Sequence, residues 1–129
     1  MDASLGFIAP LFIVEKLSRS IAFYRDLLGF ELTVTTPADE PFFAMLRRDG
    51  VRLMVKEIAP EVHPMPNHRQ HPWAKWDAYV YTPDPDALAA ELGARAVALH
   101  APLTDTDDQL RGFEVQDPDG YVLFFGRPL

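Results

Sequence analysis

The sequence predicts an α+β fold built from two βαβββ modules in a single domain, residues 1–129. Each half of the chain contains one helical pattern flanked by strand-like runs. A proline-rich connector, residues 59–74, separates the halves. The order of elements before the connector is repeated after it, which indicates an internal repeat of about 60 residues. We therefore expect the modules at about residues 7–58 and 75–127, forming curved mixed sheets around a concave groove.

The first module is predicted to contain one helix and four strands. Pro10 interrupts the first strand, residues 7–14, and because proline cannot donate to a ladder we expect this strand at an edge, bulge or hinge. A helix is expected over residues 18–28, because Ser18 can cap it, apolar side chains recur at helical spacing and Gly29 can end it. Three further strands are expected over residues 30–35, 42–46 and 51–58.

The second module repeats this order. A strand over residues 76–82 leads to a helix over residues 84–92, for which Asp84 is the expected N-cap, Pro85 the first helical residue and Gly93 the stop. Strands are then expected over residues 96–99, 112–116 and 121–125. Each module alone would leave one sheet face bare, so the modules must pack on each other or on another chain.

Two tight turns connect the predicted hairpins. In the first, Gly50 is expected to take the positive φ that the turn requires. In the second, the side chains of Asp117 and Asp119 are expected to accept backbone N–H groups, and Gly120 to adopt the left-handed conformation. We interpret this second turn as structural.

Composition excludes several classes of protein. Hydrophobic residues make up 48% of the chain, which is enough for a packed core. The net charge of −7 argues against nucleic-acid and anionic-membrane partners. The chain has no cysteine, which excludes disulfides and thiol chemistry. We see no signal peptide and no apolar run that could span a bilayer, so the expected location is cytoplasmic.

Both ends of the chain carry a family likeness. Residues 14–24, VEKLSRSIAFY, followed by Leu28-Gly29-Phe30, resemble the first strand and helix of the glyoxalase/bleomycin-resistance/extradiol dioxygenase (vicinal oxygen chelate) superfamily. Residues 111–121, RGFEVQDPDGY, resemble its last hairpin. The resemblance covers essentially the whole chain. It implies the fold, but these motifs identify no activity, because one fold serves many functions.

The resemblance also implies where a metal would bind. Metal-dependent members hold a divalent ion with four inward-facing side chains, one on each of four strands, usually His, Glu or Gln. Carried over by position, these sites fall at Ala9, Met54, Asp77 and Phe124. Asp77 is the one plausible ligand, and a single carboxylate cannot hold a catalytic ion. We therefore expect no metal and no cofactor.

The connector contains the other candidate metal ligands. His63, His68 and His71 lie near Glu61. Their spacing is irregular and they are not on a strand, so we interpret them as free surface histidines. A loop site, or a lid histidine that titrates on ligand contact, is the alternative.

Strand alternation predicts a ligand-binding surface on the concave sheet face. The predicted contacts are Arg52, Met54, Asp77, Tyr79 and Phe124. A salt bridge from Asp77 to Arg52 or Lys56 is the structural alternative for that carboxylate. Trp73 and Trp76 flank the entry to the fifth strand, where they could stack on a ligand or serve packing alone. The surface has no nucleophile–base pair, so no catalytic residue is assigned.

These features favour a metal-independent protein that binds a small molecule, either an antibiotic or an aromatic or amphipathic metabolite. The resemblance to bleomycin-resistance proteins implies the same function, and it implies a homodimer in which the Pro10 strand reaches the partner. The alternative is a glyoxalase-superfamily enzyme of the lyase, isomerase or dioxygenase type, with an atypical or absent metal site. A third reading is an accessory subunit whose groove binds nothing small.

Overall fold

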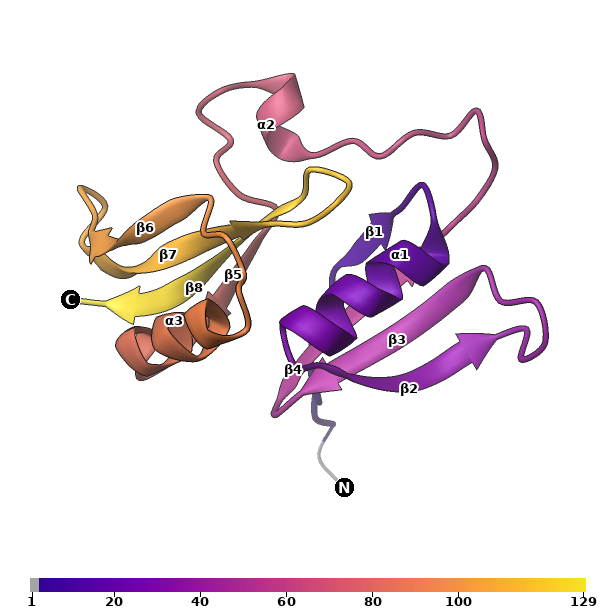
Figure 1. Cartoon of the computed structure of the whole chain (residues 1–129), viewed down its shortest axis with the longest axis horizontal. Coiled ribbons are helices and arrows are strands. Elements are labelled where there is room, and N and C mark those ends of the chain that lie inside the picture. The colour runs from indigo at the N-terminus through magenta and orange to yellow at the C-terminus, as the bar shows by residue number, and fades with distance from the viewer. Residues whose placement is uncertain (1–2) are drawn as a thin grey trace.

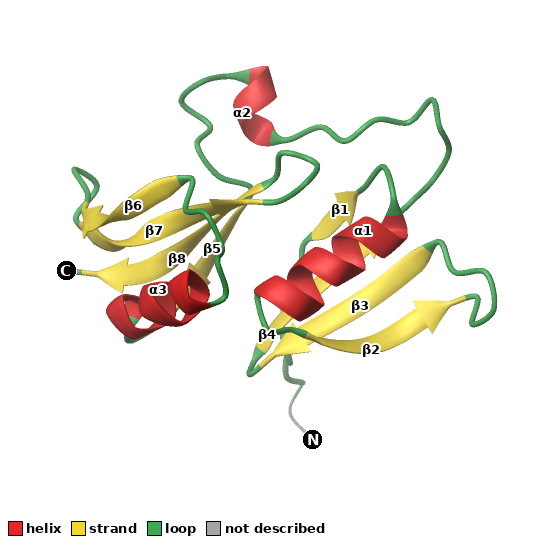
Figure 2. Cartoon of the chain, viewed as in Figure 1, coloured by secondary structure: helices red, strands yellow, loops and turns green. Residues whose placement is uncertain are grey.

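The computed structural model describes residues 3–129, which form two sheets side by side, each with a helix packed on one face (Figures 1 and 2). The elements of the first module are β1 (Leu11–Ile13), α1 (Leu17–Ala22), the π-helical turn η1 (Phe23–Leu27), β2 (Glu31–Thr36), β3 (Phe43–Arg48) and β4 (Val51–Lys56). The connector contains the short helix α2 (Asn67–Gln70). The elements of the second module are β5 (Ala78–Tyr81), α3 (Pro85–Ala94), β6 (Ala101–Asp105), β7 (Leu110–Gln116) and β8 (Val122–Pro128).

The two sheets have equivalent topologies. Their strand orders are β1-β4-β3-β2 and β5-β8-β7-β6. In each sheet the first strand of the module pairs parallel with the last, and the remaining pairs are antiparallel. Helix α1 packs on β3 and β4, and α3 packs on β6, β7 and β8. The predicted α+β fold of two βαβββ modules is confirmed.

The first helix begins differently from the prediction. Lys16 is the N-cap residue of this helix, and its side chain makes no capping hydrogen bond. Ser18 lies inside the helix. The carboxylate of Glu57, just after β4, instead accepts the N–H of Leu17 at 2.7 Å. This cap comes from a residue 40 positions away, so local sequence could not reveal it. At the second helix the predicted cap is confirmed, because Asp84 accepts the N–H of Ala87 at 3.0 Å.

Two other local predictions were wrong. The strand expected over residues 96–99 does not form; helix α3 continues to Ala94, and Ala96 adopts the left-handed conformation with φ 61°. In the first hairpin turn the positive φ belongs to Asp49, at 52°, rather than to Gly50. Aspartate tolerates this conformation better than most residues. Gly29 and Gly120 take positive φ, as expected.

One hydrophobic core contains residues of both modules. On β3 and β4 the buried side chains are those that face α1, namely Ala44, Leu46, Leu53 and Val55. The side chains between them point to the opposite, helix-free face of the sheet and are at least partly exposed. The division into a single domain stays a prediction, and this shared core supports it.

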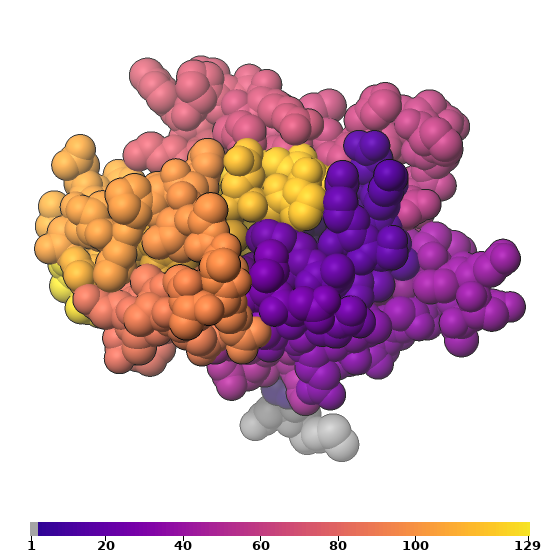
Figure 3. Space-filling model, viewed as in Figure 1, coloured from indigo at the N-terminus to yellow at the C-terminus, as the bar shows by residue number. Residues whose placement is uncertain are grey.

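A buried polar cluster joins the start of the chain to its end. The hydroxyl of Tyr24 donates to Asp117 at 2.7 Å, and Asp117 also accepts the N–H groups of Asp119 and Tyr121, both at 2.9 Å. Asp119 accepts from Arg19 at 2.9 Å and from the hydroxyl of Ser20 at 3.2 Å. Burial raises the pKa of Asp117 to about 6. Figure 3 shows this junction, where the yellow C-terminal segment meets the indigo N-terminal one.

The last turn is therefore more than a local turn. The predicted bonds of Asp117 to backbone N–H groups of the turn and the glycine conformation are confirmed. Asp119 accepts a backbone N–H as well, but it is that of Glu15, in the first module, at 3.1 Å. In addition, Tyr121 stacks on Phe12 of β1, with ring centroids 4.3 Å apart, and its hydroxyl donates to the carbonyl of Ile13 at 2.7 Å. These contacts hold the second module against the first. No helix within residues 3–129 is both long enough and apolar enough to cross a membrane.

Candidate functional site

The helix-free face of the first sheet is where the predicted site residues of β4 lie. Leu53 and Val55 belong to the core, whereas Arg52, Met54 and Lys56 alternate with them and are half-buried. The same alternation occurs in the second sheet, where Tyr79 is 41% exposed while Val80 packs against the core. Period-two alternation therefore assigns these side chains to the expected face.

Two of the four positions carried over from the metal-dependent members, Ala9 and Asp77, lie just outside the strands on which they were expected. Met54 is the partner of Leu11, and Phe124 is the partner of Tyr79. Ala9 precedes β1 and Asp77 precedes β5, each two residues before the partner of Met54 or Phe124. The register of β1 and β5 depends on pairing with strands about 40 residues away, which local pattern cannot fix.

The facing side chains do not fit a metal. Leu11, Met54 and Phe124 offer no hard donor, and Tyr79 offers a neutral phenol, whereas the metal-dependent members use imidazole, carboxylate or amide oxygen ligands. No group of three His, Asp or Glu side chains in residues 3–129 is placed to hold an ion. The donor set at this face therefore disagrees with the metal sites of the metal-dependent vicinal oxygen chelate enzymes.

Asp77 makes a different contact from the one expected. It lies just before β5, where one carboxylate oxygen accepts the N–H of Asn67 and the other that of Val122, both at 2.8 Å. The alternative salt bridge to Arg52 or Lys56 is not formed within the described residues. Both oxygens of Asp77 thus tie the connector to β8.

Three aromatic rings stack on the helix-free face of the second sheet. The ring of Phe124 stacks with Trp76, centroids 5.0 Å apart, and with Tyr79, centroids 5.8 Å apart. Phe124 is only 2% exposed, so Trp76 and Tyr79 form the accessible surface of the stack. We call these three residues the aromatic stack.

The aromatic stack rests on two paired glycines. Gly112 of β7 is the partner of Gly126 of β8, and a Cβ at either position would lie 2.6 Å from the ring of Phe124. The missing side chains leave room for that ring to lie against the sheet. Gly112, in one predicted strand, and Gly126, one residue after the end of another, are the sequence signal for this close approach, which was not predicted.

A cavity of about 310 Å³ lies at the seam between the two modules. It brings together two predicted site residues, Arg52 from β4 and Tyr79 from β5, with Tyr81 and the N-terminal segment. The guanidinium carbon of Arg52 lies 4.8 Å from the ring centroid of Phe7. Met54 and Phe124 do not line this seam cavity. Its walls come from both modules, so neither module alone would form it.

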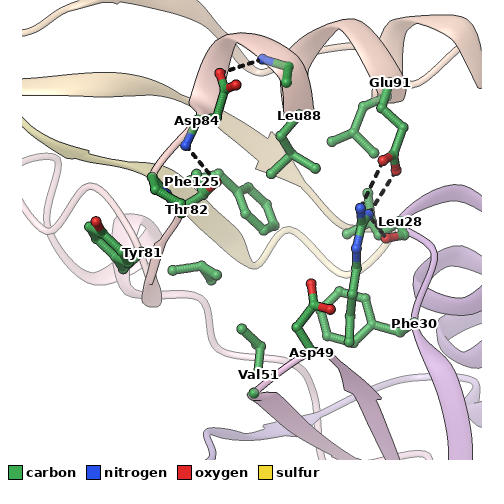
Figure 4. A pocket seen from close by; sticks show the side chains of 16 residues that line it. Leu28, Phe30, Asp49, Val51, Tyr81, Thr82, Asp84, Leu88, Glu91 and Phe125 are labelled. Atoms are coloured by element: carbon green, nitrogen blue, oxygen red, sulfur yellow. Dashed lines mark hydrogen bonds and ion pairs between the residues drawn. The ribbon is translucent and has the colours of Figure 1, made fainter.

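A second cleft, of about 470 Å³, opens beside α3 (Figure 4). At its rim the guanidinium of Arg48 donates to both carboxylate oxygens of Glu91, each at 2.8 Å, and to the carbonyl of Leu28 at 2.9 Å. This hydrogen-bonded ion pair lowers the pKa of Glu91 and joins β3 to α3. The α3 cleft and the seam cavity share a wall formed by Phe30, Gly50, Val51, Val80 and Tyr81.

The connector histidines serve separate local contacts. The Nε2 atom of His68 lies 2.8 Å from the carbonyl oxygen of Gly120, and the Nδ1 atom of His71 accepts the N–H of Trp73 at 3.1 Å. His63 is exposed. The three side chains do not converge on one point as ligands of an ion would. Trp73 is 85% exposed and takes no part in the aromatic stack.

Comparison with solved structures supports the fold. The antibiotic-binding protein TnmS3 from Streptomyces sp. CB03234 matches with a TM-score of 0.71 and 21% identity over 99% of this chain and 100% of that chain. TioX from Micromonospora sp. ML1 matches with a TM-score of 0.71 and 22% identity, covering 95% of this chain and 98% of that one. The bleomycin-binding protein of Streptomyces verticillus, solved with copper(II)-bleomycin, matches with a TM-score of 0.68 and 26% identity over the full length of both chains.

A search of curated proteins finds no match. The family model of the Glyoxalase/Bleomycin resistance protein/Dioxygenase superfamily matches residues 5–125, nearly the whole chain. The match includes both end motifs and both four-stranded sheets up to the middle of β8. This chain belongs to the glyoxalase/bleomycin resistance protein/dioxygenase superfamily.

Proposed function

We propose that this protein binds a small aromatic or amphipathic molecule at the seam between its modules, without a metal ion and without turning it over. The observation that carries the proposal is the seam cavity of about 310 Å³, whose wall includes Tyr79, the most exposed ring of the aromatic stack. Ligand pockets of this size are lined mainly by apolar and aromatic groups, with a few polar groups that fix orientation.

The predicted contact residues have different roles in this proposal. Arg52 and Tyr79 contact the ligand in the seam cavity, and Met54 extends the apolar surface on the same face of β4. Phe124 does not contact the ligand; its buried ring stacks against the rings of Tyr79 and Trp76 and holds them in place. Asp77 acts indirectly, because its two backbone contacts hold the connector next to the aromatic stack.

The structural neighbours support ligand capture. One is described as an antibiotic-binding protein and another as a bleomycin-binding protein in complex with its drug. We propose the same class of function, stoichiometric capture of a small molecule, for this chain. The enzyme alternative needs Asp77 either with a connector histidine, as a shifted metal site, or with a tyrosine, as an acid–base pair. We do not adopt it, because the oxygens of Asp77 already accept two backbone N–H groups.

We also propose that the protein is a homodimer. The segment before β1 exposes apolar side chains, with Leu5 100%, Ile8 93% and Phe7 57% exposed. Leu11 on β1, an edge strand of the first sheet, is 51% exposed as well. Soluble monomers rarely leave such a contiguous apolar surface uncovered, and an edge strand is a natural place for pairing. Sedimentation at tens of micromolar should give the mass of a dimer, and a monomer there would rule this out.

A thermal-shift screen of aromatic and amphipathic compounds, run in excess chelator, tests the binding function. A ligand at about 100 times its Kd should add about 2.7 kcal/mol of stability, a rise of about 10 °C in Tm for a chain of this size. Adding zinc or nickel should not improve the affinity of a compound found this way. Binding that appears only after metal is restored, or turnover of the bound compound, would contradict the proposal.

A further inference from the structure

The seam cavity has a local charge opposite to that of the whole protein. The chain carries a net charge of −7, yet Arg52 is the one charged residue among the described residues that line this cavity. The carboxylate of Glu114 lies on the helix-free face of β7 but does not line the cavity, because β8 separates β7 from β5. It lies 4.0 Å from the Nε2 atom of His100. Net charge is therefore a poor guide to the ligand.

Arg52 is positioned without using its hydrogen-bond donors. Its guanidinium stacks over the ring of Phe7, with 4.8 Å between the guanidinium carbon and the ring centroid. Within residues 3–129 it forms no ion pair, and no protein acceptor takes a hydrogen bond from it. Stacking of this kind orients the planar group and leaves its N–H fork free.

The surroundings of Arg52 favour a flat, apolar ligand body. Tyr79 and Tyr81 line the cavity, and both are well exposed, at 41% and 60%. The hydroxyl of Tyr79 makes a single long contact of 3.5 Å with the carbonyl of Gly126, so it can turn toward a ligand. Exposed aromatic rings beside an unpaired guanidinium provide both a stacking surface and an anion contact.

We propose that the seam cavity takes an aromatic carboxylate, with the carboxylate on Arg52 and the rings against Tyr79 and Tyr81. This inference rests on the proposed binding function and names its ligand class. The guanidinium fork matches a carboxylate in two parallel hydrogen bonds. A cationic ligand would meet Arg52 at close range, with no acidic side chain among the described residues that line the cavity. The acidic exterior opposes an anion only weakly, because charges beyond about 8 Å are screened at physiological salt.

Three probes of nearly equal shape test this inference: 2-naphthoate, 2-naphthamide and 2-naphthylmethylamine, titrated by calorimetry at pH 7 into the full chain. We expect 2-naphthoate to bind at least about tenfold tighter than the amide, a difference of about 1.4 kcal/mol, and the amine to bind most weakly. Arg52→Gln should remove the advantage of the acid while leaving the affinity for the amide unchanged. Arg52→Lys should restore part of it, since lysine keeps the charge but loses the fork.

Lys56→Gln is the matched control. It removes one positive charge from the same strand and face, about 13 Å along β4, and Lys56 does not line the cavity. It should leave all three affinities unchanged. Tightest binding of the amine, or an equal loss for all three probes in Arg52→Gln, overturns the inference while leaving the binding function standing. Failure of every probe to bind at about 1 mM also overturns it, and the compound screen then judges the binding function separately.

Discussion

Gly112→Ala tests whether the aromatic stack depends on the absence of side chains at the paired residues Gly112 and Gly126. A methyl group at position 112 would collide with the carbonyl oxygen of Phe125 and lie 2.6 Å from the ring of Phe124. The carbonyl belongs to the β7–β8 ladder and cannot move without disturbing it. Overpacking of this kind costs about 1–3 kcal/mol, and displacing Phe124 from its stacked neighbours costs about 1 kcal/mol more. We expect a total loss of about 2–4 kcal/mol.

Urea unfolding measures this loss, and near-UV circular dichroism reports the aromatic stack separately. The variant should show a lower urea midpoint and a weaker aromatic signal. Gly93→Ala is the matched control, because a Cβ there meets nothing within 4 Å and the residue lies in the last turn of α3. It should leave stability unchanged or raise it by up to about 1 kcal/mol. If Gly112→Ala unfolds within about 0.5 kcal/mol of the parent, the close approach of Phe124 to β7 is wrong.

Three further predictions concern the contacts between modules. Replacing Arg48 by Met should cost about 1–2 kcal/mol, because the bidentate pair with Glu91 is partly buried, with side-chain exposures of 28% and 38%; a double-mutant cycle with Glu91→Gln measures the coupling. Asp119→Ala should lower the free energy of unfolding in urea by about 2–4 kcal/mol, because it leaves the buried hydroxyl of Ser20 and other donors without their acceptor. Burial raises the pKa of Asp117 from 3.8 to about 6, so its contribution to stability is fully present below pH 3.8 and is lost as pH rises toward 6; Asp117→Asn should remove that part of the pH dependence of the unfolding free energy.

Each of these has a clear contrary result. A coupling energy near zero between Arg48 and Glu91 would mean that the ion pair does not hold β3 to α3. An Asp119→Ala protein as stable as the parent would mean that the buried polar cluster does not join the modules. For Asp117, the difference between the curves of variant and parent is the informative quantity, because other titrating groups contribute to both curves. A flat difference between pH 4 and 7 would contradict the raised pKa.

Features fixed by local chemistry were predictable from the sequence. The helix of the second module follows from Asp84 and Pro85, whose side chains act within one turn. The alternation on β4 follows from period two, which assigned Arg52 and Met54 to the face opposite the core. The last turn follows from Asp117 and Gly120. In each case the interacting groups lie within a few residues of one another.

Features fixed by packing between distant segments were not predictable. The cap of α1 is Glu57, and the partners of Asp77 include Val122, 45 positions away. The pairing of β5 with β8 puts Tyr79 opposite Phe124 and leaves Asp77, which was expected on the fifth strand, just before β5. The seam cavity depends on how two sheets that share no ladder lie against each other. No periodicity within one strand encodes such contacts.

The most direct test of the proposed function is to locate the ligand by calorimetry. The tightest compound from the screen is titrated, in excess chelator, into the parent, Tyr79→Ala and Asp49→Asn. Tyr79 lines the seam cavity but not the α3 cleft, and Asp49 lines the α3 cleft but not the seam cavity. We predict that Tyr79→Ala weakens binding at least about tenfold, while Asp49→Asn leaves it unchanged. Unchanged affinity in Tyr79→Ala together with loss in Asp49→Asn would contradict the assignment of the seam cavity as the binding site.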